Sequence, residues 1–160
     1  MNPGEMEALL RRSAIGRLAM TTEDGPYVVA MNYIFVEGCI YLHSGPKGRK
    51  VEALLADPRV CFLVDEVGPQ VTWEIGCGIS QIYESVICFG KAEFVEELDE
   101  KRRVLELMVR KFIPKDSPFS LVDGNVRNTA LIKIRLEWMT GKANRINPLH
   151  RIISNHVQTP

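Results

Sequence analysis

Short apolar segments separated by turn residues limit the fold of this chain more than any other feature. Segments rich in β-branched and aromatic residues, each bounded by Gly, Pro or Asp, are typical of strands joined by tight turns. We expect strands at residues 15–22, 27–36, 39–43 and 60–65, a mostly strand-like stretch at 71–94, and a last long strand at 129–139. Few helical segments alternate with them. The pattern therefore predicts a mainly β fold, a closed or split antiparallel barrel that protects its sheet edges.

The remaining segments predict three helices and some irregular chain. Residues 1–13 begin with the capping pattern of Asn2, Pro3 and Glu5 and continue as a helix. Residues 49–56 and 97–112 also carry apolar residues at helical spacing. The Gly68-Pro69 pair is expected to end the fourth strand, the segment 76–78 fits no element, and 114–125 and the tail 142–160 are expected to be irregular. No repeat or linker interrupts the chain, so residues 1–160 are expected to form one domain.

Composition excludes several classes of protein. Twenty Lys and Arg residues balance twenty Asp and Glu residues, whereas a nucleic-acid binder usually clusters basic charge. No apolar run approaches the roughly 20 residues that cross a membrane, and the first residues lack the apolar core of a secretory signal. The cysteines lack CxxC spacing and predict buried free thiols in a reducing, cytoplasmic compartment. They are Cys39, Cys61, Cys77 and Cys88.

The segment 41–64 carries the strongest local signal for chemistry. A strand ends at His43 and Ser44, a Gly/Pro loop follows, and Gly48 leads directly into a helix. Unpaired N–H groups at such a helix start suit an anion. Arg49 and Lys50 add two positive charges, which favours a phosphate monoester. An ordinary turn with solvated basic residues remains the alternative.

The order of motifs along the chain resembles the flavin-binding split-barrel superfamily of pyridoxamine 5′-phosphate oxidase, and within it the nitroimidazole-resistance branch. The matching motifs are Gly-Arg-Leu at 16–18, Pro-Tyr-Val-Val at 26–29, His-Ser at 43–44, Gly-Arg-Lys at 48–50 and Asp-Pro-Arg-Val at 57–60. The segments 83–97 and 139–145 also fit. The resemblance implies a roughly six-stranded Greek-key split barrel that forms a homodimer, with two FMN sites, each built from both chains. FAD is a second possible flavin.

The resemblance also implies a set of cofactor contacts. Arg49 and Lys50 would hold the phosphate, Gly48 would allow close backbone approach, and main-chain groups at 30–32 would meet the polar edge of the isoalloxazine. His43 and Ser44 would lie near the phosphate and ribityl chain. Tyr83 and Ser85 would come from the partner subunit, and Lys142 would approach the ring. The full set is Val29, Ala30, Met31, Asn32, His43, Ser44, Gly48, Arg49, Lys50, Tyr83, Ser85 and Lys142.

Several of these residues also have purely structural interpretations. Met31 is equally a core residue, Tyr83 an interface residue, and His43 a strand-end residue. Trp138 either stacks on a flavin or packs in the last strand. Oxidation of a vitamin phosphate is not expected, because the cofactor-contacting Trp segment and the basic C-terminal segment of the true oxidase have no counterpart here.

These features lead to one main hypothesis and two alternatives. The main one is an FMN-dependent oxidoreductase that passes electrons from a nicotinamide donor to a small electrophile, with His43 as proton donor. The branch that the chain resembles suggests a nitro-aromatic compound as this electrophile. A non-catalytic flavin or haem module, with His43, His150 or His156 as the axial ligand, is the first alternative. A barrel that binds nothing is the second. No metal site or serine-hydrolase elbow is expected, since HExxH, CxxC and GxSxG are missing from the sequence.

Overall fold

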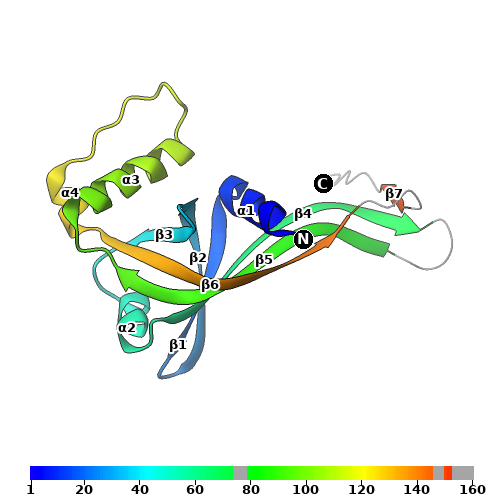
Figure 1. Cartoon of the computed structure of the whole chain (residues 1–160), viewed down its shortest axis with the longest axis horizontal. Helices are drawn as coiled ribbons and strands as arrows, with labels where there is room; N and C mark the ends of the chain where they lie inside the picture. The colour runs from blue at the N-terminus through cyan, green and yellow to red at the C-terminus, as the bar shows by residue number, and fades with distance from the viewer. Residues whose placement is uncertain (74–78, 146–149, 153–160) are drawn as a thin grey trace, which may run out of the picture.

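Residues 1–73, 79–145 and 150–152 are described by the computed structural model of the chain (Figure 1). The strands are β1 (Ile15–Thr22), β2 (Gly25–Val36), β3 (Cys39–Ser44), β4 (Arg59–Trp73), β5 (Ile79–Phe94), β6 (Ala130–Asn144) and β7 (His150–Ile152). The helices are α1 (Pro3–Arg12), α2 (Arg49–Ala56), α3 (Leu98–Phe112) and α4 (Asp123–Asn128). None of these helices is long and apolar enough to cross a membrane.

Six antiparallel strands close into a barrel. Their order is β1-β2-β3-β6-β5-β4, and β4 returns to pair with β1. The closing ladder is short: Arg17 lies opposite Leu63, and Ala19 lies opposite Cys61. β3 does not pair with the next strand in the sequence but with β6. Between β3 and β4 the chain passes through α2, and β4 lies between β5 and β1. The predicted antiparallel split barrel is confirmed.

The barrel interior holds the main hydrophobic core, and α1 packs against it. Leu9, Leu10, Tyr33 and Phe62 are fully buried, and the Tyr33 hydroxyl donates to the Leu10 carbonyl at 2.7 Å. Gly16 makes room for this packing, because a Cβ there would lie 2.1 Å from the Phe62 ring. The predicted N-terminal capping box is also present, since Asn2 and Glu5 each accept the other's backbone N–H.

A second core lies outside the barrel, where α3 and α4 cover β2, β3 and β6. Ile34, Tyr41 and Leu131 point outward from the strands and pack against Val104 and Met108 of α3. Neighbouring residues point to opposite faces of a strand, so Tyr33 and Leu42 enter the barrel while Ile34 and Tyr41 meet the helices. This second core fixes α3 and α4 beside the ends of β2 and β3.

Beyond the barrel, β4, β5 and β6 continue together as an extended arm (Figure 1). The prediction that Gly68 and Pro69 end the fourth strand was wrong. Val67 pairs with Tyr83 and Gln70 with Gln81, so two residues of β4 lie opposite one of β5. This bulge accommodates a proline, which has no N–H to donate to the ladder.

Two further predictions were wrong, and a third concerns residues that the structure does not describe. The segment 114–125, expected to be irregular, includes the start of α4, and Val126 of α4 is buried. The tail 142–160 was also expected to be irregular, yet β6 runs to Asn144 and β7 pairs with β4. The unassigned segment 76–78, with Cys77, lies outside the described residues. Of the described cysteines, all free, Cys88 is buried, while Cys39 and Cys61 are half-buried.

Candidate functional site

The N-terminus of α2 offers unpaired backbone donors at the surface. Gly48 is the N-cap residue, and no side chain caps the helix. Its φ of 115° lies in a region that favours glycine, although a Cβ there would meet nothing within 4 Å. The glycine therefore serves backbone geometry and open approach rather than packing. The first N–H groups of α2 face outward with the positive end of the helix dipole, which suits an anion.

The two basic residues after Gly48 differ in their surroundings. The Arg49 guanidinium lies 3.3 Å from the Asp24 carboxylate and 3.2 Å from the Thr22 hydroxyl, above the Tyr27 ring. Lys50 is half-buried, and burial lowers its pKa. No acidic side chain pairs with it among the described residues. Lys50 therefore lies beside the exposed start of α2 and has no carboxylate partner among the described residues.

His43 and Ser44 end β3, opposite Leu131 and Ala130 of β6. The ladder between β2 and β3 reaches only to the pair of Tyr33 and Leu42, so the two strands part at Asn32 and His43. Both of these residues are exposed, and neither side chain makes a hydrogen bond within the part of the chain that the structure describes. They are free to contact a ligand.

The predicted ring-binding segment forms an open edge of β2. From Gly25 to Asn32, β2 pairs with β1 on one side, and the β3 ladder begins only at Tyr33. Main-chain groups of residues 29–32 that point away from β1 therefore have no strand partner among the described residues. The side chains of Val29 and Met31 pack against the barrel core. Met31 thus fits its structural interpretation, while its backbone stays accessible.

The other predicted contacts lie on the arm. Ser85 of β5 lies opposite Lys142 of β6, and the Lys142 ammonium lies 5.8 Å from the centre of the Tyr83 ring. Two strands, β1 and β4, separate β5 from β2 in the sheet order. Within one chain the structure therefore forms two groups of predicted site residues and does not bring them together. Lys142, expected after the last strand, lies inside β6.

A sequence profile of the family described as pyridoxamine 5′-phosphate oxidase matches residues 2–143. The chain belongs to this family. Among solved structures, it is similar to a protein of Bacteroides thetaiotaomicron VPI-5482 whose provisional name is 5-nitroimidazole antibiotic resistance protein. The identity is 33%, the match covers 88% of this chain and 82% of that chain, and the TM-score is 0.77. The predicted resemblance is confirmed.

Two more distant structures share the fold of this pyridoxamine 5′-phosphate oxidase family member. A flavocytochrome from Azotobacter vinelandii has 18% identity over 99% of this chain and 81% of that chain, with a TM-score of 0.82. A FAD-binding protein from Mesorhizobium loti has 24% identity over 91% and 96%, with a TM-score of 0.67. At these identities the likeness shows the fold alone. No curated protein is similar enough in sequence to match the chain.

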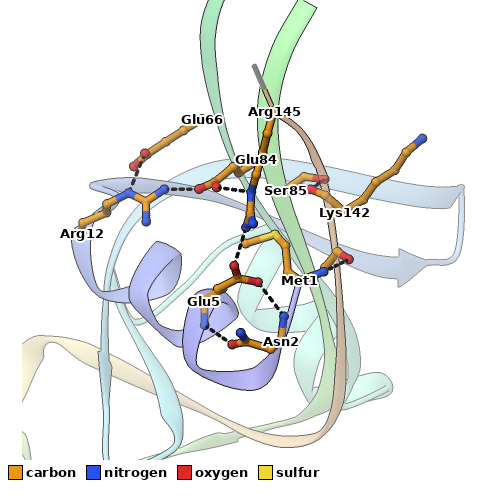
Figure 2. Close-up of polar contacts among 10 residues, drawn as sticks. Met1, Asn2, Glu5, Arg12, Glu66, Glu84, Ser85, Lys142 and Arg145 are labelled. Carbon is orange, nitrogen blue, oxygen red and sulfur yellow. Dashed lines mark hydrogen bonds and ion pairs between the residues drawn. The ribbon is translucent and has the colours of Figure 1, made fainter. Parts of the chain in front are cut away.

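A network of charges fixes α1 of the family member to the arm (Figure 2). Arg12 contacts Glu66 at 2.8 Å and Glu84 at 2.6 Å, and Arg145 contacts Glu5 at 2.7 Å and Glu84 at 3.5 Å. Burial alone raises the pKa of Glu66, but hydrogen bonds from Ser13 and Arg12 outweigh it and lower the pKa overall. Glu84 precedes Ser85, so the network helps to position the predicted contacts on the arm. In Figure 2 the Lys142 side chain points away from this network.

Sequence reasoning missed the residues around Arg49 and the apolar face of the barrel. Thr22 and Asp24, at the turn between β1 and β2, reach Arg49 because α2 packs against β1. On the outer face, cross-strand neighbours form a row of Val28, Ala19, Cys61, Phe89 and Trp138. Trp138 stacks on Phe89 with ring centres 3.9 Å apart, yet it stays 54% exposed, and Val28 is 58% exposed. These residues can be recognised as one row only when the register between the strands is known.

Proposed function

We propose that the protein binds FMN in a site completed by a second copy of the chain, and uses it to pass electrons from a nicotinamide donor to a small electrophile. The observation that carries this proposal is the half-buried Lys50, without a countercharge among the described residues, beside the uncapped N-terminus of α2. A phosphate dianion supplies the missing charge and accepts the unpaired N–H groups.

The flavin ring would lie along the open edge of β2. Its polar edge needs hydrogen-bond donors and acceptors, and the unpaired main-chain groups of residues 29–32 supply both. Asn32 and His43 stand at the end of this edge with free side chains. The structures from Azotobacter and Mesorhizobium, which share the fold, are named a flavocytochrome and a FAD-binding protein. These names also support a flavin rather than another phosphate ester as the ligand.

A second copy of the chain would complete the site. Tyr83, Ser85 and Lys142 lie on the arm, apart from α2, so they reach a flavin on α2 only from another chain. The exposed row that contains Val28 and Trp138 offers an apolar sheet face for such a contact. Because each chain would present both the α2 end and the arm, a two-fold dimer would form two equal sites.

The bound flavin would supply the redox chemistry, which is the transfer of a hydride equivalent from the nicotinamide donor to the electrophile. The chain's own residues would position both reactants and exclude water. His43 is exposed at the end of β3 and is suited to donate the second proton to the reduced product.

The direct test is the absorption spectrum of the purified protein before and after FMN is added, followed by desalting. Flavin bands that survive desalting support the proposal, and riboflavin, which lacks the phosphate, should bind much more weakly. Turnover is then tested with NADH and NADPH and a nitro-aromatic acceptor. A protein that ignores FMN but shows an intense Soret band with haem, lost in His43→Ala, would favour a haem module. A protein that binds neither would leave a barrel without a cofactor.

A further inference from the structure

A cavity of about 360 Å³ lies between the helices α3 and α4 and the point where β2 and β3 part, at Asn32 and His43. Asn32 and His43 line it from the strands, and Met108 and Val109 line it from α3. Its volume lies at the small end of the range for sites that bind small molecules, about 300–1,000 Å³. The cavity continues from the second core, which holds its walls in place.

The wall of this cavity is mostly apolar, and among the described residues no Asp, Glu, Lys or Arg lines it. Seven of its residues are apolar: Leu105, Met108, Val109, Phe112, Ile113, Leu121 and Val126. The remaining four are Asn32, His43, Asn125 and Thr129. Lys111, next to Phe112 on α3, is not part of the wall and donates to the carbonyls of Ser13 and Tyr33. An anion in this cavity would lose its hydration without gaining a cation.

Two of the four polar residues of the wall, Asn32 and His43, lie where the strands part, and the other two lie in α4 and directly after it. Thr129 already donates its hydroxyl to the backbone carbonyl of Asn125 at 2.8 Å. The side chains of Asn32 and His43 on the strands, and that of Asn125 on α4, make no hydrogen bond with any described residue. One end of a ligand can therefore accept or donate hydrogen bonds at the strands while its remaining surface contacts α3 and α4.

We propose that this cavity binds a small, uncharged aromatic compound, with a polar substituent toward Asn32 and His43. This inference rests on the proposed function in one respect: the compound is then the electrophile, held beside a flavin that lies along residues 29–32. The cavity selects neutral ring compounds and rejects phosphorylated or carboxylated ones. The substrate class thus differs from the phosphate ester in the family's name.

The experiment uses the six methionines as reporters. Only Met108 lines the cavity, whereas Met31 lies in the proposed flavin segment and Met20 is in the barrel core. With ¹³C-methyl methionine labelling, the probes are neutral 4-nitrobenzyl alcohol, anionic 4-nitrobenzoate and 4-nitrophenyl phosphate, added to the full chain with and without FMN. We expect the neutral probe to shift the Met108 signal in both states, and the charged probes to bind at least tenfold more weakly.

Two variants of α3 test the location. Val109→Trp fills the cavity and should weaken binding of the neutral probe at least tenfold, while Leu107→Trp, on an exposed face of the same helix, should not. Unchanged Met20 signals verify the fold of each. Val109→Arg provides a cation and should improve binding of 4-nitrobenzoate.

The outcomes separate this inference from the proposed function. If Met108 responds to the neutral probe and no flavin band survives desalting after FMN is added, the cavity is a binding site and the flavin proposal fails. If Met31 responds to FMN but Met108 ignores the neutral probe or responds equally to 4-nitrobenzoate, the cavity inference fails alone. Displacement of the probe by FMN would also overturn it, because the cavity would then hold the flavin ring itself.

Discussion

Ser85 lies directly opposite Lys142 across β5 and β6, on the arm of the sheet, while the α2 end that begins with Arg49 lies at the barrel (Figure 1). Residues of both groups are predicted flavin contacts, yet one chain does not bring them together. A site that uses both groups therefore needs two chains, and this requirement can be tested without knowledge of the substrate.

We expect mixed dimers to recover FMN binding that neither parent has. Lys50→Glu places a negative charge at the phosphate position, and Lys142→Glu alters the arm, so each variant alone should lose FMN. In a randomly mixed dimer population, about a quarter of the sites combine an intact α2 end with an intact arm. Fluorescence titration after co-refolding should find about that fraction. No recovery would mean that each site is built within one chain.

If Lys50 contacts the phosphate of FMN, Lys50→Met should weaken the binding of FMN but not that of riboflavin. A charge-assisted hydrogen bond contributes about 1.5–3 kcal/mol, so FMN affinity should fall at least tenfold while riboflavin affinity stays the same. Burial lowers the pKa of Lys50, so FMN binding by the unmodified protein should weaken as the pH rises through that lowered value. Lys50→Met should lack this dependence. Lys115→Met, an exposed lysine after α3, is the matched control for isothermal titration.

Most strands could be predicted because the residues that indicate a strand or a turn are neighbours in the sequence. The strand expected at 15–22 is β1 without change, and the His43 to Lys50 segment was recognised because strand, loop and helix follow one another in the chain. The bulge at Gly68 and Pro69 was missed, since it depends on the register with β5. The α4 helix was missed because it has six residues and no side-chain cap, and burial of Val126 against α3 and β6 stabilises it.

The site was predictable only in part, for the same physical reason. No sequence pattern places Asn32 and His43 under α3, because that neighbourhood depends on how α3 and α4 fold back over the sheet. Likewise, Arg49 meets Asp24 only because α2 packs against β1 in the folded chain. Local motifs identified the anion-binding end, whereas the cavity and the exposed apolar face come from tertiary structure.

The exposed apolar face predicts a dimer that Trp138→Glu weakens. Trp138 is more than half exposed and stacks on Phe89, so a charge there should leave the core intact and oppose burial of the face. Analytical ultracentrifugation should show a shift toward monomer. Leu55→Glu, an exposed position on α2, should leave the association unchanged. A Trp138→Glu protein that associates like its parent would place the interface elsewhere.

Close packing at Gly16 predicts a destabilised variant with a matched control. In Gly16→Ala the new Cβ would lie 2.1 Å from the Phe62 ring, so the ring or the strand must move. Overpacking of this kind costs about 1–3 kcal/mol in the free energy of unfolding. Gly124→Ala adds a methyl group in α4 where nothing lies within 4 Å, and it should be neutral or stabilising. Urea unfolding of both variants provides the comparison.

Glu66 predicts how stability depends on pH. Burial opposes ionisation of Glu66, but hydrogen bonds from Ser13 at 2.5 Å and from Arg12 lower its pKa in the folded protein. A folded pKa below the unfolded value means that the stabilisation is complete above the ordinary pKa, near 4.5, and is lost as the pH falls through the lowered one. Because the side chain is partly exposed, Glu66→Gln should cost only about 1 kcal/mol at pH 7.

At pH 3 the difference between Glu66→Gln and the parent should shrink, because the parent's carboxylate is then losing its charge as well. Urea midpoints at pH 7 and pH 3 measure both values. Glu7→Gln breaks an exposed pair with Arg11 within α1 and should change stability by less than about 0.5 kcal/mol at either pH. An equal loss at both pH values in Glu66→Gln would show that the Ser13 contact depends on shape rather than on the charge of Glu66.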